Sequence, residues 1–204
     1  MSAAATNSDE PADAGRRHFL VVATTTVGLA GVAATAVPFL ASWRPSAKAK
    51  ALGAPVEVDI SKLDMGALMK VEWRGQAIYI VRRTADMLAH LKDHDGMLRD
   101  PESTNKEQQP AYITGETRSI KPEVLVLIGV CTHLGCAPMD RFTPGDAELG
   151  ASWPGGFYCP CHGSKFDLSG RVFAGVPAQD NLRVPPYHFL SDNRIIIGAD
   201  PGVA

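Results

Sequence analysis

This 204-residue sequence has little net charge, few aromatic residues and only four cysteines. Its 20 lysines and arginines nearly balance 22 aspartates and glutamates, and no basic stripe is interleaved with aromatic side chains. These absences remove the usual footprint of a nucleic-acid-binding surface, so no nucleic-acid partner is expected. No internal repeat or low-complexity block is evident, and the length suits one globular domain with an appendage.

Charge is also missing from one long segment near the start of the chain. A helix over Phe19–Ala41 would be about 34 Å long at roughly 1.5 Å per residue, enough to cross a hydrocarbon core of about 30 Å. A buried core helix is disfavoured because the apolar residues go all the way round and the flanks are charged. A cleaved export signal is an alternative, but Ala41-Ser42-Trp43 is a poor small-x-small cleavage site. We predict a retained transmembrane anchor over residues 18–43.

Two adjacent arginines, Arg16 and Arg17, precede this segment. Arg16-Arg17-His18-Phe19-Leu20 resembles the core of a twin-arginine export signal, which directs folded proteins across the membrane. Paired arginines stay on the inner side, so residues 1–17 are predicted to be cytoplasmic. The remainder would then lie in the bacterial periplasm, where oxidising conditions allow a disulfide to persist.

The rest of the chain divides into a predicted tether, residues 44–55, and a predicted β-rich head, residues 56–204. The first is composed mainly of Ala, Lys, Pro and Gly, with almost nothing to bury, which favours a flexible hinge. A short helix is expected over 84–91, and the polar segment 92–117 is expected to be a long surface loop. Strands are predicted from alternation or continuous apolar runs at 56–60, 70–74, 76–83, 124–130, 184–190 and 194–198.

All four cysteines fall in two short boxes, Cys131-Thr132-His133-Leu134-Gly135-Cys136 and Cys159-Pro160-Cys161-His162-Gly163-Ser164. Each box offers a Cys–His pair and one further cysteine. Two thiolates on one iron and two imidazoles on the other form a known kind of [2Fe–2S] centre. In this interpretation the ligands are Cys131, His133, Cys159 and His162, while Cys136 and Cys161 are left free to be tied to each other.

Two other interpretations use the same boxes. A zinc site with two cysteines and two histidines would leave two cysteines unexplained, and the crowding of Gly135, Pro160 and Gly163 would be unusual around it. A pair of disulfides would require both histidines to fall at ligand distance by chance. We prefer the iron–sulfur centre. The remaining histidines and the acidic residues of the long loop are interpreted as solvated or packing side chains: His18, His90, His94, His188, Asp93, Asp95 and Asp100.

The choice of imidazole ligands has a chemical consequence. Neutral imidazoles put less negative charge on their iron than thiolates do, so the reduced form is less disfavoured and the potential rises. Each imidazole also keeps a second ring nitrogen that can gain or lose a proton. Electron uptake can then be coupled to protonation, as a quinol donor requires.

The two boxes, the arginine pair, the anchor, the tether and Arg118–Glu123 together resemble the Rieske subunit of the bacterial cytochrome bc1 complex. The resemblance covers residues 16–198. It implies an all-β fold, a Rieske-type antiparallel β-sandwich with a small cluster-binding subdomain at about residues 129–180 and one transmembrane helix before it.

The resemblance also implies roles for residues around the cluster. Cys136 and Cys161 would form a disulfide that braces the two ligand loops, and Ser164 would donate a hydrogen bond to a bridging sulfide. Leu134 would be an apolar cover, and Gly175-Val176-Pro177-Ala178 would form a third, proline-containing loop. Phe166 stands where many members have a tyrosine whose hydroxyl donates to a ligand sulfur. A somewhat lower reduction potential is therefore expected here.

The family's activity supplies the expected function. Ubiquinol at cytochrome b would hydrogen-bond His162, or else His133, and give one electron to the cluster and a proton to the histidine. The head would swing on residues 44–55 and reduce cytochrome c1, within a dimeric quinol–cytochrome c reductase that contributes to proton translocation.

Three alternatives come from other classes of protein. A soluble Rieske ferredoxin has neither the extra cysteine pair nor an anchor. The small subunit of an arsenite oxidase would not co-purify with b- and c-type haem. A zinc-binding module would give no EPR signal on reduction.

Overall fold

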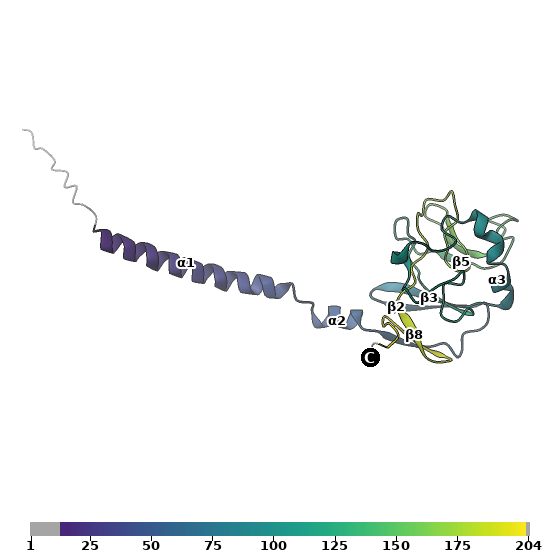
Figure 1. Ribbon diagram of the computed structural model, residues 1–204, viewed down its shortest axis with the longest axis horizontal. Coiled ribbons are helices and arrows are strands. Elements are labelled where there is room, and N and C mark those ends of the chain that lie inside the picture. The colour runs from purple at the N-terminus through teal and green to yellow at the C-terminus, as the bar shows by residue number, and fades with distance from the viewer. Residues whose placement is uncertain (1–12, 203–204) are drawn as a thin grey trace, which may run out of the picture. The chain divides into compact units, whose positions relative to one another are not determined.

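The computed structural model describes residues 13–202. They divide into an N-terminal unit that ends at Ala49 and a head that begins at Lys50 (Figure 1). The first helix, α1, spans Ala14–Ser42, and the Asp13 carboxylate caps it by accepting from the Gly15 amide at 3.0 Å. Helix α1 is long and apolar enough to cross a membrane, a property that it shares with signal sequences.

The hydroxyl groups of α1 are satisfied within the helix. The hydroxyls of Thr24, Thr25 and Thr26 each donate to the carbonyl four residues earlier, at 2.7–2.8 Å. Such bonds let threonine enter a water-poor environment without an unpaired donor. The helix begins four residues before the predicted anchor, so Arg16 and Arg17 lie in its first turn.

A second helix, α2, spans Ala47–Gly53 and occupies most of the segment predicted as a tether. The Ser46 hydroxyl accepts from the Ala49 amide at 3.1 Å at its start. Near its end, the Leu52 carbonyl accepts from the Arg74 amide in the β2–β3 turn, at 3.2 Å. Alanine and lysine favour helix as well as flexible linkers, which is why composition did not distinguish the two states.

The strands of the head pair into three three-stranded sheets among residues 13–202, all of them antiparallel (Figure 1). The first sheet has the order β1 (Val56–Asp59), β9 (Arg194–Ile197), β8 (Tyr187–Ser191). The second has the order β2 (Leu68–Trp73), β3 (Gln76–Arg82), β4 (Val124–Ile128). The third has the order β5 (Met139–Arg141), β6 (Gly156–Cys159), β7 (Ser164–Phe166).

The predicted strands are confirmed in the first two sheets, with shorter bounds in places. Strand β8 begins only at Tyr187, after Pro185 and Pro186, which have no amide to donate to a sheet. The third sheet was not predicted. Its strands have only three or four residues, too few for a period of two to show.

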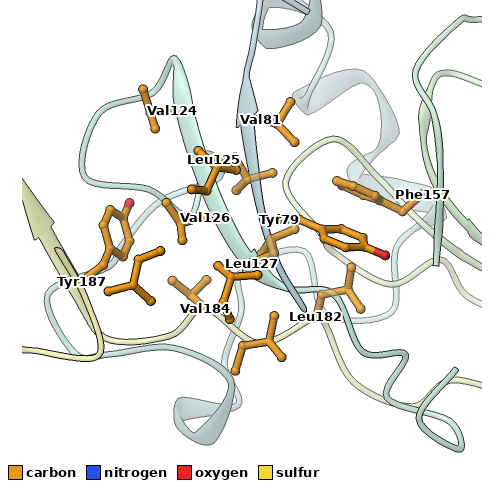
Figure 2. Packing of buried hydrophobic residues seen from close by; sticks show 14 of the residues in the cluster. Tyr79, Val81, Val124, Leu125, Val126, Leu127, Phe157, Leu182, Val184 and Tyr187 are labelled. Atoms are coloured by element: carbon orange, nitrogen blue, oxygen red, sulfur yellow. The ribbon is translucent and has the colours of Figure 1, made fainter. Parts of the chain in front are cut away.

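The main core lies against β3 and β4 (Figure 2). All five residues of β4 are buried, which explains its uninterrupted run of valine, leucine and isoleucine. From β3, Tyr79 joins the core, and from the third sheet, Phe157 joins it. The second and third sheets are therefore parts of one packed head.

The segment between β3 and β4 is less exposed than expected. Helix α3 (Ala85–Ala89) and two 3-10 helices, η1 (Lys92–Met97) and η2 (Lys106–Gln108), interrupt it. Leu98 and Ile113 within it are buried. The predicted surface loop over 92–117 is exposed or half-buried over most of its length, but it contains two 3-10 helices, and Leu98 and Ile113 pack on the head.

The prediction of a solvated acidic face was incomplete, because two of its three members, Asp95 and Asp100, are half-buried and bind partners in the head. The Asp95 carboxylate binds the buried Arg171 guanidinium at 2.7 Å. The Asp100 carboxylate accepts from the Thr104 amide and hydroxyl at 2.8 and 3.0 Å. Asp93 is exposed and pairs with His90 at 2.8 Å. Asp95 and Asp100 meet their partners only when the loop folds, and the sequence alone does not indicate how it folds.

Three arginines, Arg83, Arg118 and Arg171, are fully buried in the head. Arg83 donates to the Leu168 carbonyl and Arg118 to the Ser169 carbonyl, each at 3.0 Å. Burial lowers the pKa of both Arg83 and Arg118 to about 10, so both stay charged at neutral pH. Both carbonyls belong to the segment that follows the second box, so the two arginines hold that segment in place.

Arg171 completes this network through an ion pair. Its Nε donates to the Asp167 carboxylate at 2.7 Å, and both side chains are 1% exposed. Its remaining donors reach Asp95 at 2.7 Å and the Leu91 carbonyl at 2.8 Å. The pair therefore ties the segment after the second box to the long loop.

The buried pair makes a stability prediction. Arg171→Met removes the ion-pair partner of the buried Asp167 carboxylate, which keeps only its backbone donors and more distant charges, and we expect it to lower the free energy of unfolding by about 3 kcal/mol or more. The control is Arg194→Met, which removes an exposed pair with Glu57 and should cost no more than about 1 kcal/mol. Urea unfolding of the full chain in detergent measures both. Equal losses in the two variants would contradict the assigned role.

Candidate metal centre

The first box follows directly from the most buried strand. After β4, Gly129 turns the chain, and a Cβ at this position would overlap the ring of Tyr79. The Cys131 amide then donates to the Cys136 carbonyl at 2.8 Å, and the Gly135 amide donates to the Cys131 carbonyl at 3.0 Å. The box is therefore a tight loop that is closed on itself, with its first cysteine at the core.

The second box is the turn of the β6–β7 hairpin. Cys159 ends β6 and is paired in register with Ser164, which begins β7. The Gly163 amide donates to the Cys159 carbonyl at 3.0 Å, and Gly163 has a φ of 78°, a conformation that glycine adopts without strain. This turn directs Cys161 and His162 outward, where both are exposed.

The fold brings the two boxes together. A disulfide joins Cys136 to Cys161, as the resemblance implied. The rings of His133 and His162 lie edge to face, with centroids 4.8 Å apart. Cys131 and Cys159 are free, and each is only 2% exposed. The site therefore has a buried thiol side and an outer imidazole side.

The electrostatics of the thiol side favour a bound cation. Burial raises the pKa of Cys131, the His133 amide lowers it by donating to the thiol, and the neighbouring Cys159 raises it again. The Ser164 hydroxyl also lowers it by a side-chain hydrogen bond. Because the net pKa of Cys131 is raised, two thiolates side by side here require positive charge from a metal.

The donor set fits an iron–sulfur group with two sulfur and two nitrogen ligands. Each box supplies one buried thiol and one imidazole. The sulfurs of Cys136 and Cys161 also lie within 4.8 Å of the Cys159 sulfur. They are bonded to each other and carry no thiolate charge, so they are not ligands.

A third loop closes over the site. The Ala178 amide donates to the Ser164 hydroxyl at 3.0 Å, so Ser164 contacts both this loop and Cys131. The Thr132 hydroxyl donates to the Asp180 carbonyl at 2.6 Å. Gly175, with a φ of 75°, turns the loop, and Pro177 is exposed on it.

Two apolar residues occupy contrasting positions near the site. Leu134 is 71% exposed at the tip of the first box. Phe166 is fully buried and paired with Phe157 across β6 and β7. It carries no hydroxyl with which to donate to a ligand sulfur.

Sequence reasoning missed residues that support the site from a distance. Thr132 and Tyr79 reach the third loop and the end of the first box by side-chain hydrogen bonds. Thr132 lies inside the first box, and this position could have indicated a role in supporting the site. Tyr79 lies 59 positions from its partner, Pro138, and no local pattern marks it.

Two family models match the chain. One, described as the Rieske [2Fe-2S] domain, matches residues 55–187. The other, described as the ubiquitinol-cytochrome C reductase Fe-S subunit TAT signal, matches residues 6–46. A solved structure titled hyperthermophilic respiratory Complex III is 25% identical and covers 87% of this chain and 99% of its own, with a TM-score of 0.44.

Curated relatives match nearly the full length. The ubiquinol-cytochrome c reductase iron-sulfur subunit of Allochromatium vinosum is 54% identical, over 93% of this chain and 91% of the relative. The subunit of the same name from Blastochloris viridis is 45% identical, over 97% of this chain and 99% of the relative. Since identity of this order extends over both the anchor and the head, the chain belongs to the family of Rieske [2Fe–2S] subunits of ubiquinol-cytochrome c reductase.

Proposed function

We propose that this chain carries electrons from ubiquinol at cytochrome b to cytochrome c1 within a quinol–cytochrome c reductase. The observation that carries the proposal is the pairing of two imidazoles, 4.8 Å apart, on the outer side of two buried thiols. When bound, the [2Fe–2S] group supplies one-electron chemistry at a potential raised by imidazole ligation. The ligands are Cys131, His133, Cys159 and His162.

The exposed imidazole of His162 receives the proton of the quinol in this proposal. His162 is exposed whereas His133 is only partly so, which favours His162 as the contact. Leu134, 71% exposed beside it, provides apolar surface for docking against cytochrome b. Ser164 and the third loop at Gly175 and Pro177 keep water from the thiol side.

Helix α1 anchors the chain in the bacterial inner membrane in this proposal. Arg16 and Arg17 lie at the cytoplasmic end, and the head lies in the periplasm, where the Cys136–Cys161 disulfide can persist. Residues 44–55 connect the anchor to the head. They allow the head to move between cytochrome b and cytochrome c1 within a dimeric complex.

The function is tested by purifying the chain from its own membranes in mild detergent. We expect b- and c-type haem to co-purify, with ubiquinol–cytochrome c activity that drives proton translocation. His162→Ala should abolish this activity, because the quinol loses its proton acceptor, whereas His90→Ala, outside the boxes, should keep it. A chain that purifies without haem, or a fully active His162→Ala complex, would contradict the proposal.

Phe166 makes a prediction about the reduction potential. A tyrosine hydroxyl at this position would donate to a ligand sulfur, and one hydrogen bond of about 1 kcal/mol corresponds to about 40–50 mV for one electron. We therefore expect Phe166→Tyr to raise the potential by that amount in protein-film voltammetry. An unchanged or lower potential would refute the idea.

The tether makes a separate prediction about turnover. Polyproline is semi-rigid and extended, at about 3.1 Å per residue, so five prolines in place of Ala47–Ala51 should block movement of the head. We expect turnover to be lost while the spectrum of the metal centre stays unchanged. The control replaces Lys48 and Lys50 with arginine, which preserves helix propensity and charge. Normal quinol oxidation in the polyproline variant would indicate a fixed head.

A further inference from the structure

Tyr79 connects the central sheet to the end of the first box. It lies in β3 and is 1% exposed. Its hydroxyl donates to the Pro138 carbonyl at 2.8 Å, in a buried hydrogen bond. Pro138 is itself buried and stands two residues after Cys136. A strand without any proposed ligand therefore holds one end of a ligand loop.

The ring of Tyr79 is held between the segments that lead into both boxes. Gly129, just before the first box, lies so close that any side chain there would overlap the ring. Phe157 in β6, just before the second box, stacks with the ring, with centroids 6.0 Å apart and planes inclined by 27° (Figure 2). The Lys70 ammonium lies 5.1 Å from the ring centroid. The hydroxyl thus has little freedom to leave Pro138.

We propose that Tyr79 is a positioning residue for the metal centre. Its hydroxyl fixes the end of the first box, and the disulfide transmits this restraint to the second box. Tyr79 thereby sets the reduction potential without touching a ligand. The potential argument rests on the proposed electron-transfer function, whereas the restraint on the two loops does not.

The contacts that would transmit the effect are short and continuous. From Pro138 the chain runs back to Cys136, whose carbonyl accepts from the Cys131 amide at 2.8 Å. The backbone amides of this loop, that of His133 among them, are donors available to the Cys131 sulfur. Hydrogen bonds to ligand sulfurs raise the reduction potential, because they stabilise the more negative reduced state. A looser first box would weaken them.

The second branch passes through the disulfide. Cys136 is bonded to Cys161, which precedes His162. Cys161 is exposed, so a thiol in solution can attack its sulfur and form a mixed disulfide. The displaced Cys136 thiolate closes the original bond again unless the first box opens locally, so net reduction depends on this opening. Without the Tyr79 hydroxyl, the Pro138 carbonyl loses its donor and this opening becomes easier.

Tyr79→Phe tests the proposal, because it removes one oxygen and keeps the ring. The matched control is Tyr112→Phe, whose hydroxyl accepts from the Tyr187 amide at 3.0 Å, beside a sheet that carries no proposed ligand. We expect Tyr79→Phe to lower the reduction potential and to speed reduction of the disulfide by dithiothreitol about tenfold, the equivalent of about 1.4 kcal/mol. Tyr112→Phe should change neither, even if it lowers the unfolding temperature as much.

The measurements separate this proposal from the proposed function. The disulfide assay is run on the full chain in detergent, both with iron and after its removal. Equal reduction rates in Tyr79→Phe and wild-type protein, in either form, would overturn the positioning role. An unchanged potential, or the same shift in Tyr112→Phe, would overturn the claim that Tyr79 tunes the centre, whatever the quinol activity.

Discussion

The covalent tie between Cys136 and Cys161 joins two loops that different sheets deliver to one place. The first box leaves β4 of the second sheet, and the second box is the hairpin turn of the third sheet. Without a bond between them, each loop would depend on its own few backbone hydrogen bonds. With it, two thiols stay buried while two imidazoles face outward, 4.8 Å apart. Electron transfer coupled to proton transfer requires this two-sided arrangement.

A network of buried polar groups supports the loops that the disulfide joins. Arg83, Arg118 and Arg171 hold the segment after the second box by donating to its carbonyls and to Asp167. Asn181 extends this network, since its side chain accepts from the Val172 amide at 2.8 Å and donates to the Asp100 carbonyl at 3.0 Å. Because each buried charge has its partners, the network can hold the third loop against the site at a modest cost in stability.

The sequence indicated the candidate ligands better than it indicated the residues that surround and support them. Spacing within the boxes predicted four ligand candidates; in the structure the two imidazoles lie edge to face and the two thiols are buried and free. The continuous apolar run at 124–130 predicted a strand, and all five residues of β4 within it are buried. By contrast, no local pattern indicates the ion pair of Asp95, because its partner, Arg171, lies 76 positions away. Short strands such as β5 and long-range contacts such as that of Tyr79 leave no local periodicity to detect.

The most direct test of the account is pulsed EPR of the anaerobically reduced, purified chain. The account predicts a signal with an average g value well below that of the free electron, carrying hyperfine couplings from two imidazole nitrogens. His133→Cys should keep a signal and lose one of these couplings, because a thiolate would replace one imidazole. A signal without imidazole nitrogen couplings, or metal analysis that returns zinc and no iron, would contradict the mixed nitrogen–sulfur centre on which the proposed function depends.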